Sequence, residues 1–475
     1  MRRLLAALPV VLLLLSGCGA AEEPPPPPPP PPPVTPTVET TAGEWAGRIG
    51  IPDAPLEIGI RLTAENGGLR GEIDIPAQAI TAMPLSDVLL EGRELSFRLP
   101  ELGGDAWFRG TFEADGKSIP GAFTQYGQSY PLVLRPGPVA GRPQEPKPPF
   151  PYRVEEVTYA GDGVDLAGTL TRPEGPGPFT AVLLLSGSGP QNRDAEFFGH
   201  KPFLLLADLL TRAGYAVLRV DDRGVGGSGG QLYESTYEQL TADAVAGVEF
   251  LRTRPEINRD RIGLLGHSEG GYLAPMVAQR TPIAFVIMMA TPATPGEEVV
   301  VTQNQLVLEA AGAPPGFVEQ QAAYVRTLAA LLRAEDYERA RALAVQQLVA
   351  QAEALPPEQR PAVEDLEAQI AATVNPYYRS WIVHDPAPAL QALRVPVLAL
   401  YGGADLQVSA GQNEPLMRNL LAGSPDATVR TLPGLNFLMQ PARTGALDEY
   451  ATIDTTIDPS ALEYVRSWLT QRFPR

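Results

Sequence analysis

Residues 262–272 read Ile-Gly-Leu-Leu-Gly-His-Ser-Glu-Gly-Gly-Tyr, and this stretch decides the fold. An apolar strand at 262–265 leads into Gly-His-Ser-Glu-Gly at 266–270, and a helix is expected at 272–279. A serine between two glycines at a strand-to-helix turn is typical of a nucleophile elbow, because the glycines let neighbouring backbone pass close to the serine. The five-residue motif alone says little, but the strand before it and the helix after it make Ser268 the predicted nucleophile.

Apolar strands and helices alternate on both sides of this turn. The expected strands are Ala181–Leu185, Tyr215–Val220, Ile283–Met289 and Val395–Leu400, and the expected helices are Phe203–Leu210 and Glu234–Leu251. Continuous apolar strands are typical of parallel sheets that are covered on both faces. Strands that alternate with helices therefore predict an α/β fold with a doubly wound, mostly parallel sheet.

A long insertion, at about residues 295–386, interrupts this alternation before the strand at 395–400. It is rich in Ala, Gln, Leu and Glu and has apolar residues at helical spacing. An insertion here predicts a helical cap over the carboxyl ends of the strands, where open α/β sheets bind ligands. Its candidate pocket-lining residues are Tyr377, Tyr378 and Trp381.

Shorter segments precede the α/β unit. The predicted organisation is a leader at 1–18, a Pro-rich linker at 19–40, a small antiparallel β domain at 41–136, a second linker at 137–152, and the α/β domain at 153–475. In the β domain, residues 56–62 alternate in polarity before an Asn-Gly-Gly turn signal at 66–68, which favours a barrel or a sandwich. That domain contains no histidine or cysteine, so either a structural companion role or a binding role fits it.

The leader predicts an exported protein. Arg2 and Arg3 precede an apolar run at 4–15, which is shorter than the roughly 20 residues of a transmembrane helix. Leu-Ser-Gly-Cys at 15–18 resembles the lipobox of bacterial lipoproteins, which implies that Cys18 is lipidated and becomes the first mature residue. A plain signal peptide with an incidental cysteine is the alternative.

A lipid on Cys18 would place the protein in the cell envelope, on the periplasmic face of a bacterial membrane and attached through the lipid anchor only. Gly19, where retained lipoproteins have aspartate, favours the outer membrane. Prolines 24–33 would then form a stiff polyproline II spacer. Because Cys18 is the only cysteine of the chain, no disulfide within the chain is possible.

The composition of the chain limits the classes of partner that it can bind. The chain has 475 residues and a formal charge of −18, which argues against nucleic acid, whose phosphates need a basic surface. No cluster of residues in the sequence indicates a metal site.

Two further loops belong with the elbow. Ser-Gly-Ser-Gly-Pro at 186–190 follows an apolar strand, where an oxyanion hole is expected, and such a hole needs two backbone N–H donors. The N–H groups of Ser188 and Glu269 are the candidates. Asp405 follows the strand at 395–400, and its place after Ser268 fits the chain order serine, aspartate, histidine.

The run at 224–229 matches G-x-G-x-x-G and raises a dinucleotide-binding alternative. A Rossmann site would have this motif at the first strand of its unit. Here Asp-Asp-Arg at 221–223 intervenes and the elbow follows in the next unit, so we interpret the match as fortuitous and expect no cofactor.

Taken together, the motifs at 186–191, 200–204, 221–224, 266–270 and 405–408 resemble those of the EstD-type esterases. These are α/β hydrolases similar to the dienelactone hydrolase and serine aminopeptidase relatives, often exported and carrying an N-terminal β domain. The resemblance covers about residues 41–475. It implies a carboxylester hydrolase that acts on a small-molecule ester or acyl substrate without a cofactor, with Ser268 as nucleophile and Asp405 as the triad acid.

One position departs from that family. Its members have leucine-asparagine-histidine after the last strand, and that histidine is the general base; here the chain has Leu-Asn-Phe at 435–437. Phe437 can neither accept the serine proton nor return it to the leaving group. Two hypotheses follow: an impaired carboxylesterase, or an inactive pseudo-hydrolase that serves as an envelope binding or scaffold protein.

Only three histidines remain as possible substitutes. His267 is expected to point away from the serine pocket, because it belongs to the elbow. His200 is expected to be structural, and His384 to be solvated or to cap a helix.

Overall fold

The computed structural model describes residues 34–51, 56–78, 80–138, 142–354, 360 and 363–474. The predicted leader, Cys18 and the proline run at 24–33 lie outside the described residues. Within those ranges, no helix is both long and apolar enough to cross a membrane.

The first domain is an antiparallel sheet of nine strands in the order β4-β3-β2-β1-β9-β8-β7-β6-β5. Its elements are α1 (Val38–Thr41), β1 (Gly43–Ile49), β2 (Leu56–Glu65), β3 (Gly68–Ile75), the 3₁₀ turn η1 (Pro76–Gln78), β4 (Ile80–Pro84), β5 (Ser86–Glu91), β6 (Glu94–Arg98), β7 (Trp107–Thr111), β8 (Ile119–Gln125) and β9 (Gln128–Pro136). In β2, Ile60 and Leu62 are buried and Arg61 is exposed, as a half-buried strand requires. The predicted all-β domain is confirmed.

The second domain has an eight-stranded mixed sheet in the order β10-β11-β13-β12-β14-β15-β16-β17. Its strands are β10 (Arg153–Ala160), β11 (Asp165–Arg172), β12 (Phe179–Leu185), β13 (Ala216–Val220), β14 (Ile257–His267), β15 (Val286–Met289), β16 (Val397–Gly402) and β17 (Ala427–Leu432). β10, β11 and β13 pair antiparallel, and the remaining pairs are parallel. The predicted α/β fold class is confirmed.

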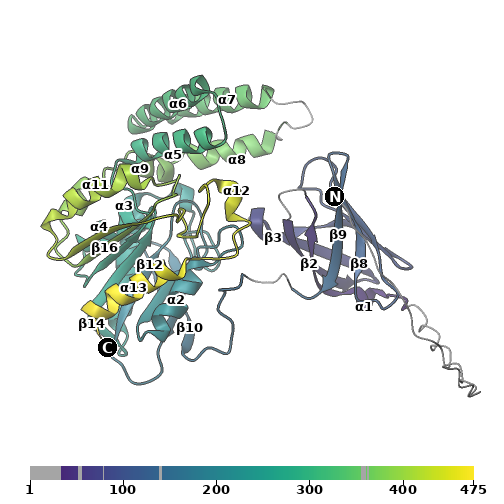
Figure 1. The fold of residues 1–475 in the computed structure, drawn as a ribbon, viewed down its shortest axis with the longest axis horizontal. Helices are drawn as coiled ribbons and strands as arrows, with labels where there is room; N and C mark the ends of the chain where they lie inside the picture. The colour runs from purple at the N-terminus through teal and green to yellow at the C-terminus, as the bar shows by residue number, and fades with distance from the viewer. Residues whose placement is uncertain are drawn as a thin grey trace, which may run out of the picture.

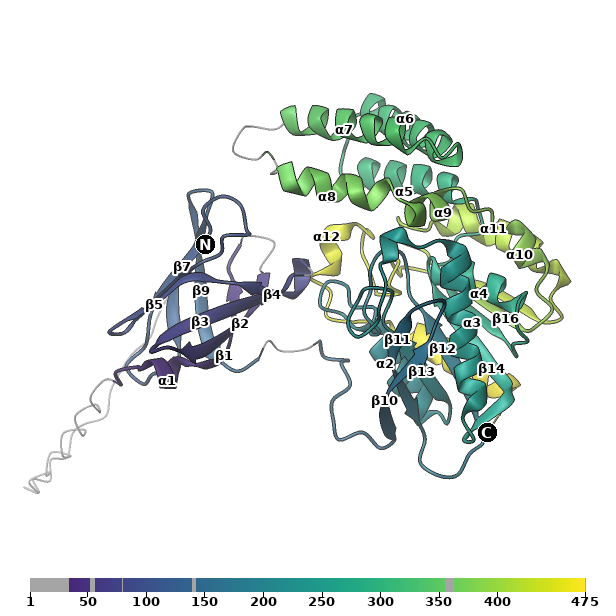
Figure 2. The same ribbon diagram turned by 180° about the vertical axis from the view of Figure 1, so that it is seen from behind.

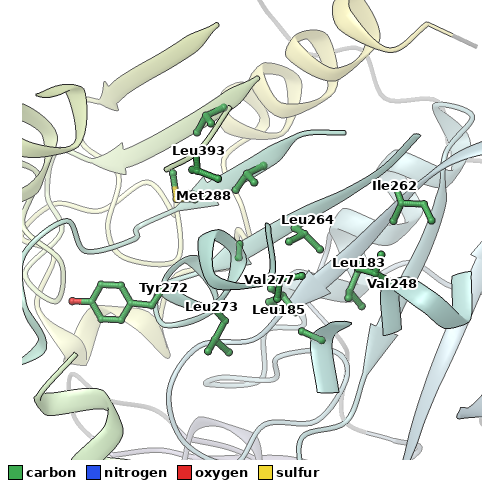
Figure 3. Close-up of a cluster of buried hydrophobic side chains, with 14 of the residues drawn as sticks. Leu183, Leu185, Val248, Ile262, Leu264, Tyr272, Leu273, Val277, Met288 and Leu393 are labelled. Carbon is green, nitrogen blue, oxygen red and sulfur yellow. The ribbon is translucent and has the colours of Figure 1, made fainter. Parts of the chain in front are cut away.

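Helices cover both faces of this sheet (Figures 1 and 2). The helices of this domain are α2 (Pro202–Arg212), α3 (Tyr237–Thr253), α4 (Gly270–Ala278), α10 (Ala387–Gln391), α11 (Ala410–Leu420) and α13 (Pro459–Arg472). The shorter α12 (Leu447–Tyr450) lies beyond one end of the sheet (Figures 1 and 2), and 3₁₀ turns are formed by η2 (Leu232–Glu234) and η4 (Leu421–Gly423). Successive side chains of β12 alternate between the faces. Leu183 and Leu185 pack in the core under α3 and α4 (Figure 3), whereas Val182 and Leu184 pack in the core under α2 and α13.

The insertion between β15 and β16 is helical, and it lies over one end of the sheet (Figure 1). It consists of α5 (Gly296–Ala310), α6 (Pro315–Arg333), α7 (Tyr337–Glu353), α8 (Val363–Thr373) and α9 (Pro376–Ile382). Val300, Val325, Leu328 and Ile382 join these helices in a small core of their own. This is the predicted cap.

The end of the second linker is fixed to the α/β domain. Gln144 Nε2 donates to the carbonyl of Ile457 at 2.9 Å, and Gln144 Oε1 accepts from the N–H of Thr456 at 2.6 Å. Arg142 donates to the carbonyl of Ala451 at 2.8 Å. The linker therefore packs along the α/β domain from residue 142 onward.

Candidate active site

The elbow has the strained geometry that a presented nucleophile needs. Ser268 has φ +53°, and its N–H donates to the carbonyl of Met289 at 2.9 Å. A Cβ added at Gly266 would lie 2.3 Å from the backbone of Gly270, and one added at Gly270 would lie 2.1 Å from Leu185 O. Only glycine fits these two positions, so the motif is a packing requirement as well as a signature.

Ser268 lies in a cavity of about 150 Å³ between the sheet and the cap. The sheet side contributes Gly187, Ser188, Ser268 and Phe437, and the cap contributes Gln303 and Trp381. Of the three aromatic residues expected to line it, only Trp381 does so. Tyr377 lines a second cavity, and Tyr378 packs against Trp381 with ring centroids 5.5 Å apart.

Backbone donors are available where the oxyanion hole was predicted. Among the described residues, neither the N–H of Ser188 nor that of Glu269 has an acceptor. The N–H of Gly189 is occupied, because it donates to the Tyr377 hydroxyl at 2.7 Å. The N–H groups of Ser188 and Glu269 are therefore both free to donate, as the donors of an oxyanion hole must be.

Asp405 is buried with half of its carboxyl group unused. Oδ1 accepts from the N–H groups of Gln407 at 2.8 Å and Val408 at 2.9 Å. Oδ2 is buried and has no hydrogen-bond partner among the described residues. Burial raises the pKa of Asp405 from 3.8 to about 7, although the two N–H donors act to lower it.

Phe437 stands in the wall of the Ser268 cavity, where it packs against His267 with ring centroids 4.5 Å apart. The carbonyl of Phe437 pairs with His267 Nε2 at 3.0 Å. His267 lines the cavity, so the expectation that it points away is wrong. The residue ends β14 directly before the turn, and the Phe437 carbonyl holds its ring beside the cavity.

The other two histidines do not line the Ser268 cavity. His200 is fully buried, with Nδ1 3.0 Å from the Thr456 hydroxyl and Nε2 3.2 Å from the carbonyl of Tyr450; burial lowers its pKa to about 4. His384 was expected to be solvated or capping. Instead its ring packs against Tyr237 and Tyr272, and burial lowers its pKa to about 4.

Backbone N–H groups of the glycine-rich run at 224–229 donate hydrogen bonds to other atoms of the protein. Gly224 donates to the carbonyl of Gly229 at 3.0 Å, and Gly227 donates to Asp221 Oδ2 at 3.1 Å. A phosphate-binding loop needs such groups free. In the described ranges, no three His, Cys, Asp or Glu side chains are grouped as a metal ion would require.

The structure adds contacts that the sequence did not indicate. The Tyr377 hydroxyl, from the cap, donates to Glu269 Oε2 at 2.5 Å. Gln303, also from the cap, bonds to Gln407 beside Asp405. Such pairs depend on how the cap docks, and one tyrosine among 15 carries no signal in the sequence.

Parts of the chain are similar to known proteins. Residues 162–422 match the family model described as X-Pro dipeptidyl-peptidase (S15 family). Esterase EstD of Thermotoga maritima is 28% identical over 291 residues, which are 61% of this chain and 61% of EstD. Human dipeptidyl peptidase 8 is 32% identical over 158 residues, 31% of this chain and 17% of that protein.

Solved structures that are similar to part of this chain include an esterase of Pyrococcus furiosus, Pf2001, at 15% identity and a TM-score of 0.42 over 67% of this chain and 91% of that one. A dienelactone hydrolase from Anabaena variabilis matches at 15% identity and a TM-score of 0.37, over 68% and 98% of the two chains. The family match extends over more than half of the chain and includes the elbow and Asp405. The chain thus belongs to the X-Pro dipeptidyl-peptidase (S15) family, within the α/β hydrolases.

Proposed function

We propose that this protein is a serine hydrolase of small carboxylic esters whose proton relay is interrupted at Phe437. Ser268 is the nucleophile, and the N–H groups of Ser188 and Glu269 form the oxyanion hole. Asp405 is the acid that would orient a base. The esterase relative supports the reaction class, and the cavity of about 150 Å³ favours short acyl groups.

One observation carries the proposal: Asp405 Oδ2 is a buried acceptor with no partner. In a serine triad this oxygen receives the N–H of the histidine and holds the ring in the tautomer that serves the nucleophile. An unpaired carboxyl oxygen in an apolar site is costly. The unpaired Oδ2 supports a site built to receive an imidazole, and we propose that Phe437 stands where that imidazole would be.

Slow turnover follows from this arrangement. General acid–base catalysis contributes about 10²–10⁴-fold, and a protease that loses its triad histidine falls by about 10⁶ in kcat. The oxyanion donors and the strained serine remain, so residual Ser268-dependent hydrolysis is expected above the uncatalysed rate.

Replacing Phe437 by histidine tests the proposal. Phe437→His should raise hydrolysis of p-nitrophenyl acetate and butyrate by at least about 10²-fold. Ser268→Ala in that background should remove the gain, and Asp405→Asn should remove most of it because the new ring loses its orientation. Phe197→His is the matched control, since Phe197 lines the same cavity without being at the base position.

Two results would contradict the proposal. Strong Ser268-dependent activity in the unmodified protein would mean that another base serves the serine. A folded Phe437→His protein with no more activity than Phe197→His would mean that the catalytic site is incomplete elsewhere, and would favour a role in binding.

A further inference from the structure

A second cavity lies behind the loop of the proposed oxyanion hole. It has a volume of about 80 Å³, several times the ~10–15 Å³ that one water molecule needs. Its polar lining includes Ser186, Asp222, Arg223, Glu269 and Tyr377. Gly187 lines both this cavity and the one that holds Ser268, so the loop that starts at Ser186 separates the two.

Four carboxyl groups line this cavity, and two of them are neutralised. Asp243 pairs with Arg223 at 2.5 Å. Asp221 pairs with Arg193 at 2.7 Å. In the part of the chain that the structure describes, Asp222 and Glu269 have no cationic partner. The cavity therefore has two uncompensated acidic groups.

Asp222 is held by neutral donors. Its Oδ1 accepts from the Ser186 hydroxyl at 2.7 Å, and its Oδ2 accepts from the N–H of Gln191 at 2.9 Å. Each carboxylate oxygen has lone pairs for a further donor. The carboxyl group is thus fixed in place but is not saturated.

Glu269 has the unpaired acceptor oxygen on which the inference depends. Its side chain is 3% exposed, and Oε2 accepts from the Tyr377 hydroxyl at 2.5 Å. Oε1 has no hydrogen-bond partner among the described residues. The Tyr237 hydroxyl lies near enough to lower the pKa of Glu269 without completing a hydrogen bond to it. A buried acceptor without a partner is unfavourable by about 1–3 kcal/mol, and a donor from a ligand would remove that penalty.

We propose that this cavity is a binding site for a small primary ammonium ion. An ammonium group supplies a positive charge and three N–H donors, which suit Glu269 Oε1 and the free lone pairs of Asp222. A divalent metal is a poorer fit, because the described residues place no three metal-ligating side chains together. Leu232, Leu240 and Leu273 form the apolar wall, which suits a short alkyl group.

The protonation of the two carboxyl groups agrees with this chemistry. Burial raises the pKa of both Asp222 and Glu269 to about 7. The remaining charged groups around the cavity are the Asp221–Arg193 and Asp243–Arg223 pairs. Affinity for an ammonium ion should therefore increase from pH 6 to pH 8, as the carboxyl groups ionise.

Binding of ethylammonium chloride to the full-length protein tests the proposal. It is measured by isothermal titration calorimetry and by saturation-transfer difference NMR. One ethylammonium per chain is expected at pH 8. Ethanol, with the same number of heavy atoms and no charge, should not bind, and tetramethylammonium, which has no N–H, should not compete. No ester turnover is measured, so the result is independent of the proposed esterase activity.

Substitutions locate the site. Glu269→Gln and Asp222→Asn should each weaken ethylammonium binding about tenfold or more, since each removes a charged acceptor. Glu234→Gln, the same change at an exposed neighbouring position, should leave it unchanged. Circular dichroism of each variant checks the fold. Absence of saturable binding to the unmodified protein, or equal binding by folded Glu269→Gln, folded Asp222→Asn and Glu234→Gln, would overturn the proposal.

Discussion

At the scale of single residues, Asp405 makes stability depend on pH. Its folded pKa of about 7 lies above the ordinary 3.8, so folding favours the protonated form. The cost of burying the charge is absent below about pH 4, grows as the pH rises and is complete above pH 7. Asp405→Asn retains Oδ1 as an acceptor and carries no charge.

The expected result is a stability gain for Asp405→Asn that is larger at pH 8 than at pH 5, and that is on the order of 4 kcal/mol at most. Urea unfolding of both proteins at the two pH values measures it. Asp260→Asn, at an exposed position, is the control. An equal difference at both pH values would show that the carboxyl group of Asp405 is not held in an apolar site.

The elbow glycines give a second prediction at this scale. Gly270→Ala places a Cβ 2.1 Å from Leu185 O, whereas the nearest atom to a Cβ at Gly229 is 3.6 Å away. Gly270→Ala should lower the free energy of unfolding by about 3 kcal/mol through overpacking. Gly229→Ala should change it by less than about 1 kcal/mol. Calorimetric melting compares them, and equal melting temperatures would contradict the packing account.

Sequence order was enough to nominate Ser268 and Asp405, because each follows a recognisable strand, whereas Phe437 was nominated only through the resemblance to the EstD-type esterases. It was not enough to orient His267. The direction of the last side chain of a strand depends on how the turn leaves it, and here the Phe437 carbonyl, 170 residues away, fixes the ring. The vacancy at Asp405 Oδ2 likewise exists only in three dimensions.

At the scale of elements, the cap limits the acyl group. Trp381 of α9 lines the small cavity that holds Ser268. Trp381→Ala should therefore improve binding of octanoyl relative to acetyl ketone analogues about tenfold or more, since each buried methylene contributes about 0.8 kcal/mol. Fluorescence titration measures the ratio. Phe317→Ala, an exposed cap residue, should leave it unchanged, and an unchanged ratio in Trp381→Ala would exclude a lining role.

The strands of the α/β sheet that were predictable share one property: they are buried on both faces. β12 and β16 are continuous apolar runs and lie close to their predicted ranges. β10 was not predicted, because its exposed Arg153 and Glu156 obscure the strand pattern at the edge of the sheet. β14 begins at Ile257, five residues before its predicted start, since the polar residues 258–261 follow Ile257.

At the scale of the whole molecule, the hypothesis of a lipid anchor rests on sequence alone. We propose that Cys18 carries the lipid, because a lipobox-like run follows an apolar leader. Cys18→Ala should move the protein from the membrane fraction to the soluble envelope fraction. Immunoblots of fractionated cells measure this, with Ser16→Ala as a control that keeps the cysteine. Unchanged fractionation of Cys18→Ala would refute the anchor.

The cap and the catalytic loop share a single hydroxyl, that of Tyr377, which joins the N–H of Gly189 to the carboxyl of Glu269. Displacing α9 would break both hydrogen bonds at once, and each contributes about 0.5–1.5 kcal/mol, or up to about 3 kcal/mol where the acceptor is charged. We therefore expect the conformation with α9 docked to be the more populated one. For a Phe437→His enzyme we expect that, once proton transfer is fast, displacement of α9 limits how quickly ester enters and acid leaves, so that further improvement of the chemistry brings no faster turnover.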